Sequence, residues 1–236
     1  MIIDVHCHLL YGVDDGPDSL EESVEMPRHA RQQGIQSMIL TPHYRHGMFG
    51  YPVERIRRHY EQLLPEAESM GISLFLGCEF HVNSYIVEYI EQKRCLPLAG
   101  SNYLLTEYSF ETEYSYIIEQ TKMLVSYGYI PVIAHVERYG CILKSPQLCE
   151  ELSRAGALIQ INADSVLGME GGNGKRFCRK ALKNRWADIV ASDAHGIRRR
   201  ACHMRECRDY IAKKYGEDYA QSLFFDVPSQ ILKHAR

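Results

Sequence analysis

Short runs of apolar residues alternate along the chain with longer segments whose apolar positions recur at roughly helical spacing. The apolar runs predict buried strands at residues 2–5, 37–40, 72–76, 103–106, 130–134, 158–161 and 189–192. The segments between and after them predict helices near residues 19–34, 53–70, 84–92, 114–127, 147–155, 175–184, 199–214 and 218–225. Strands that alternate with longer helices are typical of β-α units around a parallel sheet.

The number of these units favours a closed barrel. About seven β-α units follow one another, and no stretch between them is long enough or biased enough in composition to be a linker. Short buried strands in this number indicate an α/β fold of the irregular (β/α)7, TIM-like barrel type, with residues 1–236 forming a single domain. An open doubly wound sheet is the alternative.

Composition narrows the classes of function. The 236 residues are 45% hydrophobic and 24% charged, with a formal net charge of -3. This balance gives no reason to expect a nucleic-acid or membrane surface. No basic segment leads into a long apolar run at the N-terminus, so we predict neither a signal peptide nor a membrane span. The eight cysteines form no Cys-x-x-Cys pair, and we expect free thiols in a cytoplasmic protein.

Residues that can bind metals follow nearly every predicted strand. The first strand runs directly into His6 and His8, which face the same side of an extended chain. The residues that follow the later strands are His43, Glu79, Glu107, His135, Asn162, Asp193 and His195. The carboxyl ends of barrel strands meet on one face, so we expect these side chains to converge there. They are too many for one tetrahedral ion and predict two or three divalent ions, either manganese, iron or zinc.

Two arginines near these residues suit a phosphoryl substrate. Arg138 follows His135 by three residues, and Arg200 follows His195 by five in a run of three arginines. A guanidinium group matches phosphate with two parallel hydrogen bonds. The alternative for Arg200 is a solvated position at the start of a basic helix.

Five motifs of the chain resemble one known family. They are Asp4-Val5-His6-Cys7-His8, Val13-Asp14-Asp15-Gly16-Pro17, Thr41-Pro42-His43, Ile133-Ala134-His135-Val136-Glu137-Arg138-Tyr139 and Ala191-Ser192-Asp193-Ala194-His195. Together they resemble the PHP (polymerase and histidinol phosphatase) superfamily. Within it they are most similar to the manganese-dependent protein-tyrosine phosphatases of bacterial capsule and exopolysaccharide loci. The resemblance covers essentially the whole chain.

The resemblance implies a PHP barrel that binds up to three Mn²⁺ ions. The ligands it implies are His6, His8, Glu79 and Asp193 for the first ion, Glu79, Glu107 and His135 for the second, and Asp15, His43 and His195 for the third. Arg138 and Arg200 match the family's phosphate-binding arginines, with Arg199 as an alternative to Arg200. The implied substrate is the phosphotyrosine-rich tail of a bacterial tyrosine kinase that regulates polysaccharide synthesis.

Several rival interpretations accompany this prediction. A PHP phosphoesterase acting on a small molecule such as histidinol phosphate, or a metal-dependent binding protein without turnover, fits the same residues. Cys202 and Arg208 have the spacing of a cysteine-dependent phosphatase loop, but the residues between them predict a helix, which cannot wrap around a phosphate.

Two further hypotheses concern His43 and assembly. His43 is a candidate proton donor to the leaving group, and the chain is a candidate for assembly into a homo-oligomer.

Aromatic residues crowd after two of the predicted ligands. One group follows His43 and consists of Tyr44, Arg45, His46, Met48, Phe49 and Tyr51. The other follows Glu107 and consists of Tyr108, Phe110, Tyr114 and Tyr116. Each is interpreted either as a lid that receives a phosphotyrosine ring or as a packed surface loop.

Overall fold

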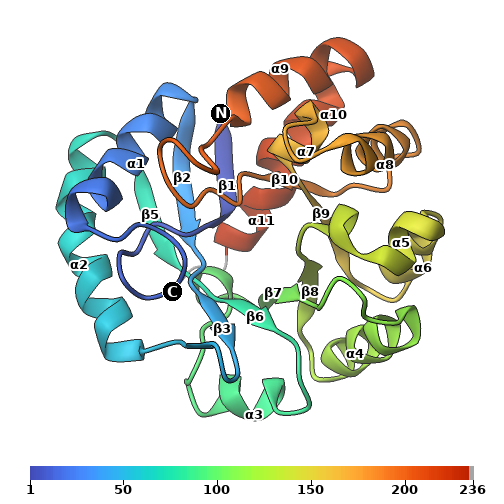
Figure 1. Cartoon of the computed structure of the whole chain (residues 1–236), viewed down its shortest axis with the longest axis horizontal. Helices are drawn as coiled ribbons and strands as arrows, with labels where there is room; N and C mark the ends of the chain where they lie inside the picture. Colours follow the sequence, from blue (N-terminus) through green and yellow to red (C-terminus); the bar gives the residue numbers. More distant parts are fainter. Residues whose placement is uncertain (234–236) are drawn as a thin grey trace.

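The computed structural model describes residues 1–233, in which strands form a central barrel and helices surround it (Figure 1). The strands are β1 (Ile2–Cys7), β2 (Ile35–Leu40), β3 (His43–Arg45), β4 (Phe49–Gly50), β5 (Ser73–Leu76), β6 (Glu79–His81), β7 (Tyr103–Glu107), β8 (Ile130–Ile133), β9 (Leu158–Asn162) and β10 (Ile189–Ala191). One sheet has the order β1-β2-β5, and the other has the order β10-β9-β8-β7-β6-β3-β4. All pairs are parallel except β3 with β4, which form a short hairpin.

The two sheets are parts of one closed barrel. β2 leads directly toward β3, and β5 leads directly toward β6, so each pair occupies one strand position. The backbone stays bonded across these breaks, because Gly77 N donates to Leu40 O at 2.8 Å. At the other seam, Cys7 pairs with Ala194 in a parallel bridge, and His8 N donates to Ala194 O at 2.8 Å. This closure confirms the predicted seven-unit barrel, and the open sheet is wrong.

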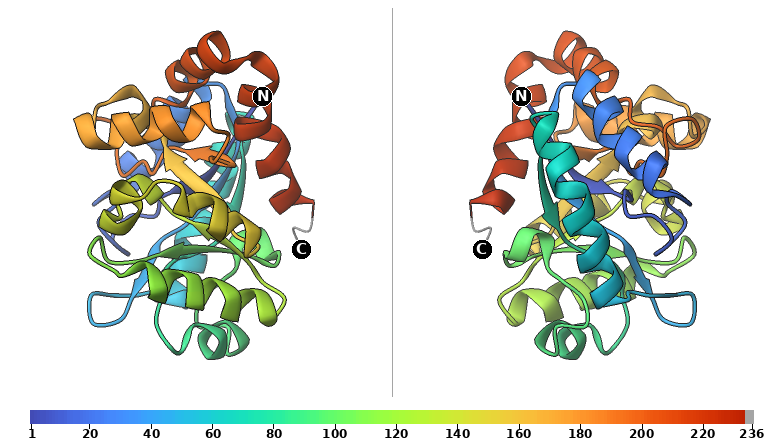
Figure 2. Two further views of the ribbon diagram at one scale, coloured as in Figure 1. Left: turned by 90° about the vertical axis from the view of Figure 1, so that its right-hand side faces the viewer. Right: turned by 90° about the vertical axis from the view of Figure 1, so that its left-hand side faces the viewer.

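The helices pack around the outside of the barrel, as Figures 1 and 2 show. They are α1 (Leu20–Gln32), α2 (Val53–Ser69), α3 (Ile86–Glu91), α4 (Tyr114–Ser126), α5 (Gly140–Lys144), α6 (Leu148–Arg154), α7 (Ala163–Leu167), α8 (Gly172–Lys183), α9 (Met204–Tyr215), α10 (Glu217–Gln221) and α11 (Val227–Leu232). Two single turns, η1 (Leu98–Gly100) and η2 (Val136–Arg138), are 3₁₀-helical, and η3 (Ser222–Asp226) is a π-helix. None of the helices within residues 1–233 has the length and apolarity needed to cross a bilayer.

Local sequence signals explain where helices begin and end. The Ser19 hydroxyl caps α1 by accepting a hydrogen bond from Glu22 N at 3.3 Å, as the Ser-x-x-Glu pattern predicts. The helix predicted from Arg199 is wrong at its start, because α9 begins at Met204. Arg200 has a φ of +50°, which a helix does not allow, and the chain therefore turns before α9 begins.

The barrel is closed by apolar packing at one end and is polar at the other. One buried cluster joins strand residues such as Val5, Val132 and Ile189 to Leu98 of η1 and Ile231 of α11. In Figure 2 (left), α11 lies on the opposite side of the barrel from the loop of residues 12–17 and the 43–50 hairpin. The polar end, where strands such as β1 and β10 finish, therefore remains available for chemistry.

Candidate metal centre and active site

The structure brings all nine predicted ligands together at the carboxyl ends of the strands. Eight of them form three overlapping groups that could each hold an ion: His6, His8, Glu79 and Asp193; His43, Glu79 and Glu107; and His8, Asp15, His43 and His195. The ninth, His135, lies beside Glu79, with its Nε2 2.9 Å from Oε1 of the carboxylate. A pocket of about 170 Å³ opens onto Glu79, Glu107, His135 and Asp193.

Glu79 lies at the centre of these groups. Its Oε2 atom is 3.1 Å from His6 Nε2, 3.3 Å from His8 Nε2 and 3.1 Å from His43 Nδ1. Burial opposes the charge of this carboxyl, but the imidazoles around it hold its pKa well below the ordinary value. Glu79 is therefore a buried anion that belongs to two of the three candidate groups.

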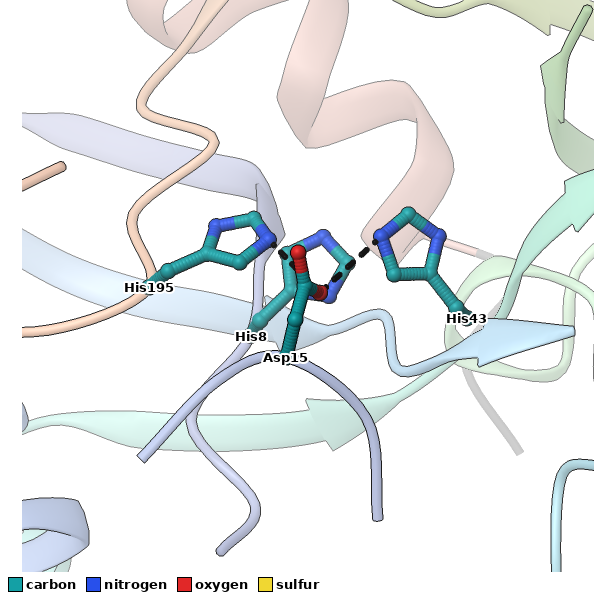
Figure 3. A group of neighbouring side chains, drawn as sticks. All are labelled: His8, Asp15, His43 and His195. Atoms are coloured by element: carbon teal, nitrogen blue, oxygen red, sulfur yellow. Dashed lines mark ion pairs between the residues drawn. The ribbon is translucent and has the colours of Figure 1, made fainter. Parts of the chain in front are cut away.

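The third group lies at the outer edge of the cluster and is shown in Figure 3. Asp15 Oδ1 lies 3.2 Å from His195 Nε2 and 3.4 Å from His43 Nε2. His8 also belongs to this group, and its ring stacks on His195 with the centroids 3.9 Å apart. The resemblance does not include His8 in this group, so the structure adds one candidate nitrogen donor near Asp15.

The donor atoms fit divalent cations. His43 Nδ1, Glu79 Oε2, Glu107 Oε2 and His195 Nε2 are buried, and within residues 1–233 none of them forms a hydrogen bond of good geometry, although ionisable groups lie close to them. Burial, together with the negative charge of Glu79, raises the pKa of Glu107 to about 7. Buried polar atoms without partners are costly, and a bound cation satisfies nitrogen and oxygen donors of this kind.

A second layer of side chains fixes the ligands, and sequence reasoning did not identify it. Asp14 Oδ2 lies 2.8 Å from His8 Nδ1. Gln160 Oε1 lies 3.1 Å from His6 Nδ1 and accepts a hydrogen bond from His135 N at 2.9 Å. A signal for Gln160 was present, because it is a polar residue inside the apolar strand β9. Such partners orient imidazoles and set which ring nitrogen is free for a metal.

Both predicted arginines converge on one oxygen of Asp193. Arg138 Nη1 lies 2.9 Å and Arg200 Nη2 lies 2.8 Å from Asp193 Oδ2. Arg138 also pairs with Glu170, and Arg200 Nη1 lies 3.5 Å from Asp15 Oδ2. The guanidinium groups thus lie at the edge of the imidazole and carboxylate cluster, where they can reach an anion bound in the pocket.

The backbone at these positions is strained. His135, Asp193 and Arg200 have φ values of +34°, +52° and +50°. Residues other than glycine adopt such angles at a cost, and this cost is common at functional sites. Here the strained turns place two presumed ligands, His135 and Asp193, and the guanidinium group of Arg200 in the lining of the same pocket.

Only part of the two aromatic groups reaches the pocket. Arg45, Met48 and Phe49 of the β3–β4 hairpin line it, as does Phe110 after β7. The Phe49 ring stacks on His43 with the centroids 5.2 Å apart. Tyr44 is buried and instead stacks on Phe80. The mouth of the pocket is therefore aromatic on two sides.

The cysteine-dependent mechanism does not fit the structure. Cys202 is buried, and burial raises the pKa of its thiol well above the ordinary value. A nucleophilic cysteine needs a lowered pKa and access to substrate. Arg208, its predicted partner, forms ion pairs with Glu217 and Asp209. The interpretation of Cys202 as a nucleophile is therefore wrong.

Comparison with known proteins agrees with this geometry. Residues 2–233 match the family described as "Capsular polysaccharide synthesis, CpsB/CapC". The tyrosine-protein phosphatase CpsB of Streptococcus pneumoniae is 34% identical over 238 residues, which cover 98% of each chain. The tyrosine-protein phosphatase YwqE of Bacillus subtilis is 32% identical over 219 residues, which cover 92% of this chain and 86% of YwqE.

Solved structures agree as well. A structure from a study of YwqE and CpsB, described as "unique metal-dependent tyrosine phosphatases", superposes with a TM-score of 0.83 at 30% identity. The match covers 99% of this chain and 92% of that one. A lactonase from Listeria monocytogenes has a TM-score of 0.60 at 11% identity, with a match that covers 98% of this chain and 94% of the lactonase; this likeness supports the fold alone. The matches over nearly the full length establish that this chain belongs to the CpsB/CapC family of capsular polysaccharide synthesis.

Proposed function

We propose that this chain is a metal-dependent tyrosine-protein phosphatase that acts in capsular or exopolysaccharide synthesis. The observation that carries the proposal is a cluster of five imidazoles and four carboxylates, buried except at Asp15 and His43 on its outer edge, with two arginines beside it. The relatives named as tyrosine-protein phosphatases support it. The aromatic mouth of the pocket supports a substrate in which the phosphoryl group is attached to a ring.

Three ions fit the donor groups. We assign His6, His8, Glu79 and Asp193 to the first, Glu79, Glu107 and His135 to the second, and Asp15, His43 and His195 to the third. The mixed nitrogen and oxygen donors suit Mn²⁺, and iron and zinc are the competing ions. When bound, such ions supply a nucleophile from water at neutral pH and neutralise negative charge on the phosphoryl group.

The side chains of the pocket perform the remaining tasks. Arg138 and Arg200 bind the non-bridging phosphoryl oxygens, and Asp193 holds both guanidinium groups in place for this contact. Phe49 and Phe110 contact the tyrosine ring. A phenol has a pKa of about 10, so it leaves more readily than an alkoxide.

The role of His43 follows from its contacts. Its Nδ1 faces Glu79 Oε2 at 3.1 Å, and its Nε2 faces Asp15 Oδ1 at 3.4 Å. Both ring nitrogens therefore point toward carboxylates of the cluster, and neither is free to face a leaving group. We assign His43 to metal binding in preference to proton transfer.

The substrate we propose is the phosphotyrosine-containing tail of a bacterial tyrosine kinase that regulates polysaccharide synthesis. The relatives' place in capsular polysaccharide synthesis supports this choice. The eight free cysteines are consistent with a reducing cytoplasm as the place of the reaction. Assembly into a homo-oligomer stays a prediction. The single domain of residues 1–236 also stays a prediction, and its last three residues, 234–236, lie outside the described residues.

One assay tests the function. The protein with added Mn²⁺ is given a phosphotyrosyl peptide, the matching phosphoseryl peptide and histidinol phosphate. We expect kcat/KM to be highest for the phosphotyrosyl peptide and to fall by at least about 10³-fold in Glu107→Gln, which replaces a presumed ligand. Faster hydrolysis of histidinol phosphate would identify a small-molecule phosphoesterase instead, and metal binding without any turnover would identify a binding protein.

The aromatic mouth is tested by a separate variant. Phe110→Ala removes an exposed ring from the mouth without opening the core, because 53% of Phe110 is exposed. We expect KM for the phosphotyrosyl peptide to rise severalfold while hydrolysis of acetyl phosphate, which has no ring, stays unchanged. Tyr127→Ala, at a similarly exposed ring outside the pocket lining, is the matched control.

A further inference from the structure

A second groove lies beside the active site, between α5 and α8. Its volume is about 410 Å³, larger than that of the pocket over the metal ligands. Leu143, Pro146 and Phe177 give it apolar walls, and Lys144, Arg176 and Lys180 add three exposed cations. Within the described residues, none of the side chains that line it is acidic. The groove therefore combines apolar surface with uncompensated positive charge.

The cations of α8 have no acidic partner within residues 1–233. Residues 172–183 include Lys175, Arg176, Arg179, Lys180 and Lys183 and no acidic residue. Arg176 and Lys180 are four positions apart, and like charges at this spacing destabilise a helix. In other helices, by contrast, basic residues have acidic partners: Arg154 pairs with Glu150 within α6, and Arg208 of α9 pairs with Glu217 of α10. The partners that these cations do have are neutral: Lys175 donates to Leu167 O, Arg176 donates to Asn173, and Lys180 lies over the Trp186 ring. Their positive charge therefore remains available to an external anion.

A short stretch of chain links the groove to the wall of the active site. Arg138 lies in η2, and α5 begins two residues later and ends at Lys144. Gly174, in the first turn of α8, lies against Glu137 and Ser165 behind that wall. In Figure 2 (left), α8 extends toward the same side of the barrel as the 43–50 hairpin. Six residues of extended chain span at most about 22 Å, so the Cα atoms of Arg138 and Lys144 are no farther apart than that.

We propose that the α5–α8 groove is a docking site for an acidic segment of the phosphoprotein substrate. Carboxylates of the segment pair with Lys144, Arg176 and Lys180, and an apolar side chain packs on Phe177 and Leu143. For the carboxylate that pairs with Lys144, the distance limit corresponds to about six positions from the phosphotyrosine. This inference rests on the proposed function, because it assumes that the substrate of the pocket is a polypeptide.

The test compares two peptides that each carry one phosphotyrosine. One has a Glu-Glu-Leu-Glu block five residues away, and the other has Gln-Gln-Leu-Gln at the same place; both are made with the block on either side. We expect KM for the acidic peptide to be about threefold to tenfold lower in one of the two orders, with kcat unchanged. The difference should shrink as salt is raised, because exposed charges are screened.

Variants of the groove cations test whether the lower KM of the acidic peptide depends on the groove. In Lys144→Gln/Arg176→Gln we expect the advantage of the acidic peptide to disappear while kcat/KM for p-nitrophenyl phosphate stays the same. Lys122→Gln/Lys213→Gln removes the same charge from exposed positions of α4 and α9 and should keep the advantage. Fluorescence anisotropy with a labelled acidic peptide that lacks phosphate should show the same loss of binding without any turnover.

The outcomes separate the two proposals. Equal KM values for the Glu and Gln peptides, or an equal loss in the α4/α9 variant, would overturn the docking site while the phosphatase assignment stands. If neither peptide is hydrolysed but the labelled acidic peptide still binds through Lys144 and Arg176, the proposed function fails and the groove stands.

Discussion

The carboxylate of Asp14 fixes the imidazole of His8 from behind, with Asp14 Oδ2 2.8 Å from His8 Nδ1. Both side chains are fully buried. This contact leaves Nε2 of His8 facing Glu79 and Asp193, at 3.3 and 3.6 Å. The neighbouring Asp15 points the other way, toward His43 and His195. Two adjacent carboxylates of one loop thus have different tasks, since one orients a presumed ligand and the other is a presumed ligand.

Replacing the orienting carboxylate should weaken metal binding without removing a ligand. In Asp14→Asn we expect the affinity for Mn²⁺ to fall by about 10- to 100-fold, because the amide no longer holds His8 in the required orientation and tautomer. Titration calorimetry of the metal-free protein measures this. Asp18→Asn, at an exposed position of the same loop, is the control and should bind as the wild type does. Equal affinities in the two variants would contradict the orienting role.

Eight of the nine presumed metal ligands could be identified from the sequence because each lies at or just after a strand, whereas Asp15 was implied only by the family resemblance. His6, Glu79 and Asp193 lie at the ends of apolar runs or just after them. A barrel brings the carboxyl ends of its strands together whatever conformation the loops adopt. Asp14 could not be separated from Asp15, because which of two adjacent loop residues faces inward depends on the turn. The same limit applies to α9, which begins at Met204 because Arg200 takes a left-handed conformation to reach Asp193.

The arginine run after His195 allows a matched pair of variants. Arg200 contacts Asp193 and Asp15 and lines the pocket. If it binds the phosphoryl group, Arg200→Gln should lower kcat/KM for a phosphotyrosyl peptide by about 10²- to 10³-fold. Arg199→Gln removes the neighbouring charge and should change kcat/KM by less than about threefold. A larger loss in Arg199→Gln than in Arg200→Gln would reverse the assignment.

Removal of metal should lower both activity and stability. Without cations, Glu79, Glu107 and the surrounding imidazoles keep buried atoms that have no hydrogen-bond partner in residues 1–233. Ion binding at 100 times its Kd stabilises a protein by about 2.7 kcal/mol, which for a chain of this size is a Tm difference of about 5–10 °C. We expect dialysis against EDTA to lower Tm by this amount and to abolish turnover, with recovery on adding Mn²⁺.

A variant without a complete site provides the control for chelation. His6→Ala lacks a presumed ligand of the first ion, so EDTA should lower its Tm by clearly less than it lowers that of the wild type. Unchanged Tm and activity of the wild type after dialysis would show that the cluster binds no ion important for function.

Asp188 lies outside the active site, and its ionisation should make the free energy of unfolding depend on pH. Burial raises its pKa to about 6, and the hydrogen bond from Ile159 N at 2.8 Å offsets this only in part. Between about pH 4 and pH 6 the unfolded chain has lost this proton while the folded chain still holds it. The free energy of unfolding therefore falls as pH rises through this window, by about 3 kcal/mol in total.

Asp188→Asn removes this contribution and keeps an oxygen for Ile159 N. Relative to the wild type, the variant should gain about 2–3 kcal/mol in the free energy of unfolding between pH 4 and pH 7. Urea denaturation with EDTA present measures this difference without the pH dependence of metal binding. Asp209→Asn, at an exposed position of α9, should differ from the wild type by a constant amount. A difference for Asp188→Asn that does not change with pH would mean that the buried carboxyl is already ionised in the folded protein at pH 4.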